Sequence, residues 1–207
     1  MTIEVPEGPS LEGRLASIER PRGGLVVCHP HPLYGGDMEN PVVVRAAEVA
    51  RDEGLSTLRF NFRGVGGSTG GHAQGDGEQQ DLKAALAVLR SRLPGGRPLG
   101  IAGYSFGAWV SARVASGDAG LAALCLIGPP LALLDFAELH GAGQKDVLLV
   151  AGTRDTYCPV SRLMELASRI IPGARAVTVE GADHFFFGKL FPLGEAIRGW
   201  ARGWAPR

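Results

Sequence analysis

The sequence lacks several features that would assign it to a specialised class of protein. It has 21 lysine and arginine residues and 21 aspartate and glutamate residues, so its net charge is zero. This balance argues against a nucleic-acid partner or an anionic membrane partner. No apolar run reaches the roughly 18 residues of a membrane span, and the N-terminus lacks the basic and apolar stretches of a signal peptide. We therefore expect a cytoplasmic protein with no nucleic-acid and no membrane partner.

Cysteine and histidine are also scarce. The three cysteines, Cys28, Cys125 and Cys158, are an odd number without close pairing, so the sequence predicts no disulfide framework. The five histidines do not have the spacing of a zinc site. We expect neither a metal nor another cofactor.

The length and composition are those of an ordinary globular protein. A chain of 207 residues with 45% hydrophobic and 20% charged residues can bury a large core. We expect a single domain over residues 1–207, as a monomer or homodimer.

Short apolar runs alternate with segments of helical periodicity, which is typical of an α/β protein with a doubly wound, mostly parallel sheet. The expected parallel strands are Gly24–Cys28, Leu55–Phe60, Pro98–Ala102, Ala122–Ile127, Val147–Ala151 and Ala174–Val179. The expected helices are Val42–Glu53, Glu78–Leu93, Phe106–Ser116, Pro159–Ile170 and Leu193–Trp204. Before them, Thr2–Val5 and Leu11–Ile18 predict an antiparallel β-hairpin.

The segment Gly103-Tyr-Ser-Phe-Gly107 follows a predicted strand and precedes a predicted helix. That order is typical of a nucleophile elbow, a sharp turn that exposes a serine hydroxyl above the sheet. The glycines on both sides of Ser105 suit such a turn, because a side chain there would collide with the neighbouring strand or helix. Ser105 is the candidate nucleophile.

Two later strands each end at a residue that could complete a catalytic triad. Asp155 follows one strand and His184 follows the other, so the chain order is serine, aspartate, histidine. The carboxyl ends of parallel strands share one edge of the sheet, where open α/β proteins build their sites. Asp146 and Asp183 are weaker candidates for the acid, because Asp146 precedes its strand and Asp183 is adjacent to the histidine.

These three segments resemble the catalytic segments of the α/β-hydrolase superfamily. Cys28-His-Pro-His-Pro-Leu-Tyr-Gly-Gly-Asp-Met-Glu-Asn40 and Leu58-Arg-Phe-Asn-Phe-Arg-Gly-Val-Gly-Gly-Ser68 resemble a small, lidless bacterial subgroup related to dienelactone hydrolases. The resemblance runs from about Gly24 to Phe187 and implies an α/β-hydrolase fold. Only about twenty residues separate Ile127 from Val147, with at most one short helix around Leu131–Glu138. We therefore expect no cap domain and an open site.

An ester-cleaving site of this kind also needs two backbone N–H groups to bind the oxyanion. Phe106, next to the nucleophile, is expected to supply one. The second should come from the loop after Cys28. Pro30 and Pro32 are excluded because proline has no backbone N–H. The resemblance favours His31, and Leu33 is the alternative. His29 is expected to brace this loop, and Tyr34 and Phe185 are candidates for substrate binding.

The sequence thus predicts a serine hydrolase that cleaves small-molecule carboxylic esters of small to medium acyl groups, through an acyl-enzyme on Ser105. The same triad could serve a thioesterase, a lactonase or a peptidase. A catalytically idle α/β-hydrolase fold used as a binding protein is the alternative outside enzymes.

Overall fold

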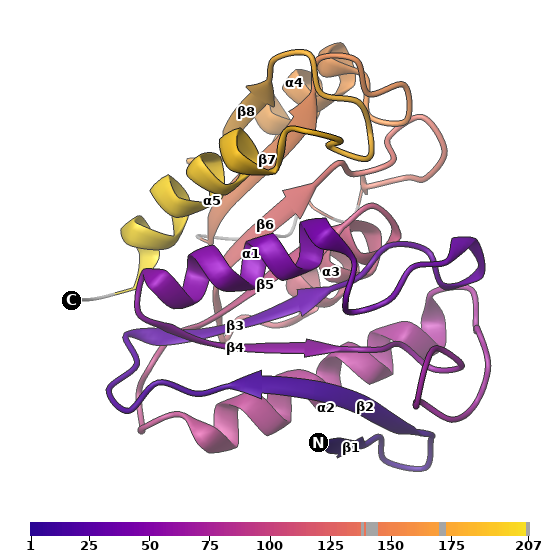
Figure 1. The fold of residues 1–207 in the computed structure, drawn as a ribbon, viewed down its shortest axis with the longest axis vertical. Helices are drawn as coiled ribbons and strands as arrows, with labels where there is room; N and C mark the ends of the chain where they lie inside the picture. The colour runs from indigo at the N-terminus through magenta and orange to yellow at the C-terminus, as the bar shows by residue number, and fades with distance from the viewer. Residues whose placement is uncertain (138, 140–144, 170–172, 206–207) are drawn as a thin grey trace.

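The described part of the chain forms one eight-stranded, mostly parallel sheet with helices on both faces (Figure 1). The structure is a computed structural model that describes residues 1–137, 139, 145–169 and 173–205. Its strands are β1 (Thr2–Glu4), β2 (Ser10–Ala16), β3 (Gly23–Cys28), β4 (Leu55–Phe60), β5 (Leu99–Tyr104), β6 (Leu121–Ile127), β7 (Asp146–Gly152) and β8 (Arg175–Val179). They lie in the order β1-β2-β4-β3-β5-β6-β7-β8.

The sheet is antiparallel only at its N-terminal edge. β1 pairs with β2 and β2 pairs with β4 in antiparallel fashion, whereas all neighbours from β4 to β8 are parallel. All residues of β3 and of β5 are buried, as expected for parallel strands covered on both faces. The predicted hairpin and the predicted doubly wound sheet are therefore confirmed.

Helices α1 (Pro41–Asp52) and α5 (Leu190–Trp204) cover one face of the sheet. Helices α2 (Asp76–Arg92), α3 (Phe106–Gly117) and α4 (Val160–Arg169) cover the other. Alternate residues of a strand point to opposite faces, so each strand contributes to two cores. In β3, Leu25 and Val27 pack on the α1 and α5 side, and Val26 and Cys28 pack on the α2 and α3 side.

The sequence allowed at most one short helix around Leu131–Glu138, and residues 131–136 are not helical. Residues 131–134 form turns in which the N–H groups of Leu133 and Leu134 both donate to the carbonyl of Pro130, and Glu138 lies outside the described residues. The N–H of Ala132 donates to the carbonyl of Tyr157 at 2.9 Å. This contact ties the segment to the loop after β7, so its backbone does not continue as a helix.

The boundaries of other elements differ from the expected ones by a few residues. α5 starts at Leu190, earlier than expected, and β5 continues to Tyr104, directly before the candidate nucleophile. The expected end of α4 at Ile170 lies outside the described residues. Among the helices that the structure describes, none has both the length and the apolar character needed to cross a bilayer.

Candidate active site

Ser105 lies in a strained turn between β5 and α3. Its φ of 56° and ψ of −117° are unfavourable for a residue with a side chain, at a cost on the order of 1–3 kcal/mol. A Cβ atom at Gly103 would lie 2.3 Å from the carbonyl oxygen of Gly107, and one at Gly107 would lie 2.5 Å from that of His29. Both positions therefore require glycine, as the sequence predicts for a nucleophile elbow.

Asp155 lies in the loop after β7, and its side chain is completely buried. Its Oδ1 accepts hydrogen bonds from the backbone N–H groups of Tyr157 and Cys158, both at 2.9 Å. Oδ1 and Oδ2 lie 3.0 and 2.9 Å from Nδ1 of His184. The two backbone donors fix the carboxylate in the orientation that receives the imidazole.

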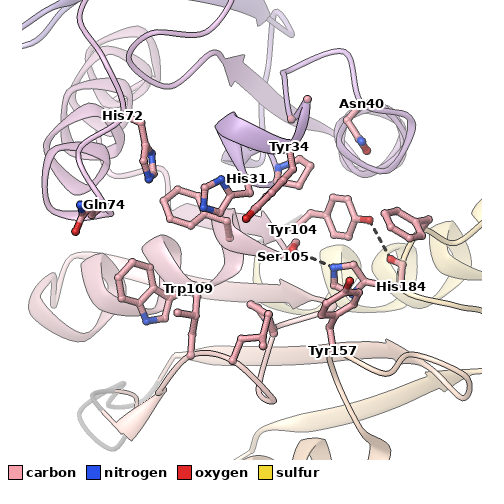
Figure 2. A pocket seen from close by; sticks show the side chains of 18 residues that line it. His31, Tyr34, Asn40, His72, Gln74, Tyr104, Ser105, Trp109, Tyr157 and His184 are labelled. Atoms are coloured by element: carbon pink, nitrogen blue, oxygen red, sulfur yellow. Dashed lines mark hydrogen bonds between the residues drawn. The ribbon is translucent and has the colours of Figure 1, made fainter.

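His184 lies in the loop after β8 and joins the acid to the serine. Its Nε2 lies 3.0 Å from Oγ of Ser105 (Figure 2), whereas Asp155 contacts Nδ1, the other nitrogen of the ring. The hydroxyl of Tyr104 donates to the backbone carbonyl of His184 at 2.9 Å. Burial raises the pKa of Tyr104, so its hydroxyl stays protonated and holds the histidine loop at the end of β5.

The side chains of the two rival acids, Asp146 and Asp183, take no part in these hydrogen bonds. Asp146 begins β7 at the opposite edge of the sheet and pairs with Arg175 at 3.0 Å. Asp183 accepts from the backbone N–H of Phe185, which makes it a local turn residue. Cys158 is buried, and burial raises the pKa of its thiol, which disfavours a thiolate nucleophile.

The loop after β3 is braced by His29, as expected. His29 is buried, with Nδ1 2.6 Å from the carbonyl of Pro30 and Nε2 accepting from the N–H of Phe62 at 2.9 Å. Nδ1 must therefore bear the proton and Nε2 must be free of one. Burial lowers the pKa of His29 to about 4, so the ring is neutral near pH 7.

The backbone of this loop separates the two candidates for the second oxyanion donor. The N–H of Leu33 donates to Nδ1 of the His31 side chain at 3.2 Å. Within the described residues, the N–H groups of His31 and Phe106 have no acceptor. The rings of His31 and Phe106 lie 4.8 Å apart beside Ser105. The geometry thus favours His31 and Phe106 as the available pair of donors.

A pocket of about 810 Å³ surrounds Ser105 (Figure 2). Tyr34 and Phe185, the two expected substrate-binding residues, both line it and are 86% and 56% exposed. The segment between β6 and β7 contributes Leu133 and Leu134 to the wall, although it is too short to form a cap domain. The site is open, with a rim of exposed apolar side chains.

Sequence reasoning missed part of this pocket. His72 and Gln74, from the loop before α2, line it together with Trp109 of α3. The aromatic residues next to the elbow could be suspected from their position, but residues 69–75, directly before α2, contain no recognisable motif. In the described ranges, no group of three or more His, Cys, Asp or Glu side chains is placed to hold a metal ion.

Comparison with known proteins assigns the family. Residues 25–189 match the family described as alpha/beta hydrolase domain. An alpha-beta serine hydrolase homologue from Coxiella burnetii is 35% identical, with a TM-score of 0.86 over 96% of this chain and 95% of its own. XC6422 from Xanthomonas campestris, described as an a/b serine hydrolase without lid, is 33% identical, with a TM-score of 0.88 over 100% of this chain and 94% of its own.

A further relative is the uncharacterized protein RP471 of Rickettsia prowazekii, 35% identical over 93% of this chain and 84% of its own. The predicted α/β-hydrolase fold and the resemblance to lidless members are confirmed by these matches. The family match includes most of the strands and the strained turn at Ser105. The chain therefore belongs to the α/β-hydrolase family.

Proposed function

We propose that the protein hydrolyses carboxylic esters of small to medium acyl groups through an acyl-enzyme on Ser105. The observation that supports this proposal most strongly is the continuous chain of contacts from Oγ of Ser105 through His184 to Asp155, with distances of 2.9 to 3.0 Å. This is the arrangement in which a histidine acts as general base toward a serine and an aspartate holds the imidazole.

In the first half of the reaction, Nε2 of His184 takes the proton from Ser105 as Oγ attacks the ester carbonyl. The oxyanion of the tetrahedral intermediate accepts hydrogen bonds from the N–H groups of Phe106 and His31. His184 then gives its proton to the departing alkoxide, and the alcohol leaves an acyl group on Ser105. Asp155 stabilises the imidazolium while it exists.

In the second half, His184 takes a proton from a water molecule, and the resulting hydroxide attacks the acyl-enzyme. Collapse of the second tetrahedral intermediate breaks the bond to Oγ, which recovers its proton from His184. One ester and one water thus give one acid and one alcohol. No step needs a metal or a cofactor.

Covalent labelling tests the assignment of the nucleophile. A fluorophosphonate probe should label the wild type and the Cys158→Ala variant, and should not label Ser105→Ala. Ser105→Ala should also lower the turnover of p-nitrophenyl acetate by several orders of magnitude while the fold is retained. An unlabelled wild type would instead indicate an idle fold, and labelling that moves to Cys158 would refute the serine.

A substrate panel tests the acyl group and the bond that is cleaved. A methylene group that becomes fully buried adds about 0.8 kcal/mol, or about fourfold in affinity, so gains should cease once the open pocket is filled. We expect kcat/KM for p-nitrophenyl esters from acetate to palmitate to peak at short or medium chains. A peak at about twelve carbons or more would contradict this expectation, and higher activity on matched thioesters, lactones or peptides would reassign the substrate.

A further inference from the structure

Two groups of aromatic rings lie on opposite sides of Ser105 (Figure 2). On one side, His31 and Phe106 contact His72, with ring centroids 4.9 and 5.6 Å from it, and Trp109 lies 5.9 Å from Phe106. We call this the His72 side. On the other side, the rings of Tyr104, Tyr157 and Phe185 lie 4.8 to 5.7 Å from His184. We call this the His184 side.

The proposed function assigns one part of the substrate to each side. The departing alkoxide takes its proton from Nε2 of His184, so the alcohol must lie next to that ring. The acyl group, bonded to the same carbonyl carbon, then extends away from His184. It therefore occupies the His72 side of the pocket.

The part of this side nearest Ser105 is apolar. Phe106 presents its ring, and Nε1 of Trp109 donates to the carbonyl of Asp135 at 3.0 Å, so the indole N–H is already bonded. A Cβ atom at Gly75 would lie 2.1 Å from Cζ3 of Trp109, which shows how closely this loop fits the indole. The walls suit a flat, apolar portion of an acyl group.

The far part of the same side is polar and has unused hydrogen-bonding capacity. Within the described residues, Nε2 of His72 and the side-chain amide of Gln74 have no hydrogen-bonding partner in the protein, and both residues line the pocket (Figure 2). Gln74 has a φ of 53°, an unfavourable conformation for a residue other than glycine. Such strain is typical of residues held in place for binding or catalysis.

Glu78 anchors the loop of Gln74 from behind and lies next to His72. The Glu78 side chain is completely buried, and its carboxylate accepts from the N–H groups of Ala73 and Gly75 at 2.9 and 2.7 Å. Its Oε1 lies 2.9 Å from Nδ1 of His72. A neutral hydroxyl group can both donate and accept hydrogen bonds here without placing a second carboxylate near Glu78.

We propose that the His72 side selects acyl groups that are flat and apolar near the carbonyl and carry a neutral hydrogen-bonding group, such as a hydroxyl, at the far end. His72 and Gln74 bind that group. This inference rests on the proposed ester hydrolysis and on the resulting position of the alcohol.

Three esters with the same p-nitrophenol leaving group test the inference. They are the esters of 3-phenylpropanoate, of its 4-hydroxyphenyl analogue and of its 4-carboxyphenyl analogue. A net hydrogen bond favours the hydroxylated ester by about three- to tenfold in kcat/KM over the unsubstituted one. The carboxylated ester should show no such gain.

Variants then locate the preference. Gln74 is exposed, so Gln74→Leu should fold and should lower the ratio between the hydroxylated and unsubstituted esters. His72→Phe should lower the ratio further, and the double variant should bring it to about one. Phe187→Ala is the matched control, because Phe187 does not line the pocket, and it should keep the wild-type ratio.

A wild-type ratio near one, or a ratio that survives the double variant, would overturn the inference. If p-nitrophenyl acetate were still hydrolysed in that case, the proposed function would stand and only the acyl preference would be wrong. If no ester were hydrolysed and no fluorophosphonate label formed, the proposed function and the acyl preference would both be wrong.

Discussion

The residues placed for chemistry and the residues that surround the substrate are held in contrasting ways. The side chains of Asp155 and His184 are 0% and 9% exposed, and each of their polar atoms that faces the other is hydrogen-bonded. Tyr34 and Leu133 at the rim of the pocket are 86% and 67% exposed. Under the proposed function, the buried residues at the sheet edge would carry out the reaction and the exposed rim would determine the choice of substrate. Changes at the edge should therefore lower kcat or stability, and changes at the rim should alter KM.

The largest effect is expected at Asp155. Asp155→Asn keeps the shape but cannot accept the Nδ1–H of His184 in the same way, so kcat should fall by about 10⁴-fold. Asp183→Asn is the matched control, because Asp183 caps a turn beside the histidine, and its kcat should stay close to the wild-type value. The measurement is steady-state turnover of p-nitrophenyl acetate; a larger loss in Asp183→Asn would refute the assignment of the acid.

The next largest effect is expected on stability, at Gly107 in the elbow. Gly117, at the other end of the same helix, provides the comparison. Gly107→Ala would place a Cβ atom 2.5 Å from the carbonyl oxygen of His29, and we expect a loss of about 3 kcal/mol in the free energy of unfolding. Gly117→Ala, at the end of α3, meets nothing within 4 Å and should be neutral or slightly stabilising. Urea unfolding of both variants gives the comparison, and equal losses would contradict it.

The sequence pointed to the three residues that the structure brings together at the sheet edge, because the signals for them are local. The glycines around Ser105, and an acid and a histidine each placed after a core strand, follow from strand geometry and steric exclusion. The walls of the pocket could not be predicted in the same way. Gln74 and Trp109 both line the pocket beside a loop whose backbone is held by the buried carboxylate of Glu78, and no sequence motif indicates those contacts.

The next prediction concerns the pH dependence of the free energy of unfolding, which should reflect the buried ring of His29. Its pKa is lowered to about 4 in the folded protein from 6.5, so the unfolded chain takes up the proton first as the pH falls. The contribution of neutral His29 is complete above about pH 6.5 and is lost as the pH falls toward 4, by up to about 3 kcal/mol.

Urea unfolding of the wild type and of His29→Gln at several pH values measures this contribution. The variant has no group that titrates at position 29, so the difference in free energy of unfolding between the two proteins should shrink between pH 6.5 and pH 4. A difference that stays constant over this range would show that the buried ring does not control the stability of the loop.

The smallest effect is expected at the exposed rim, where two neighbouring phenylalanines can be separated. Phe185 lines the pocket and contacts the ring of His184 at 5.7 Å, whereas Phe187 is 78% exposed and does not line it. Phe185→Ala removes part of an apolar wall worth about 1 kcal/mol, so KM for p-nitrophenyl butyrate should rise by about fivefold with little change in kcat. Phe187→Ala should leave both constants within about twofold of the wild type. A fall in kcat as large as the rise in KM in Phe185→Ala would show that the rim also positions His184, and the separation between chemistry and substrate choice would then fail at this residue.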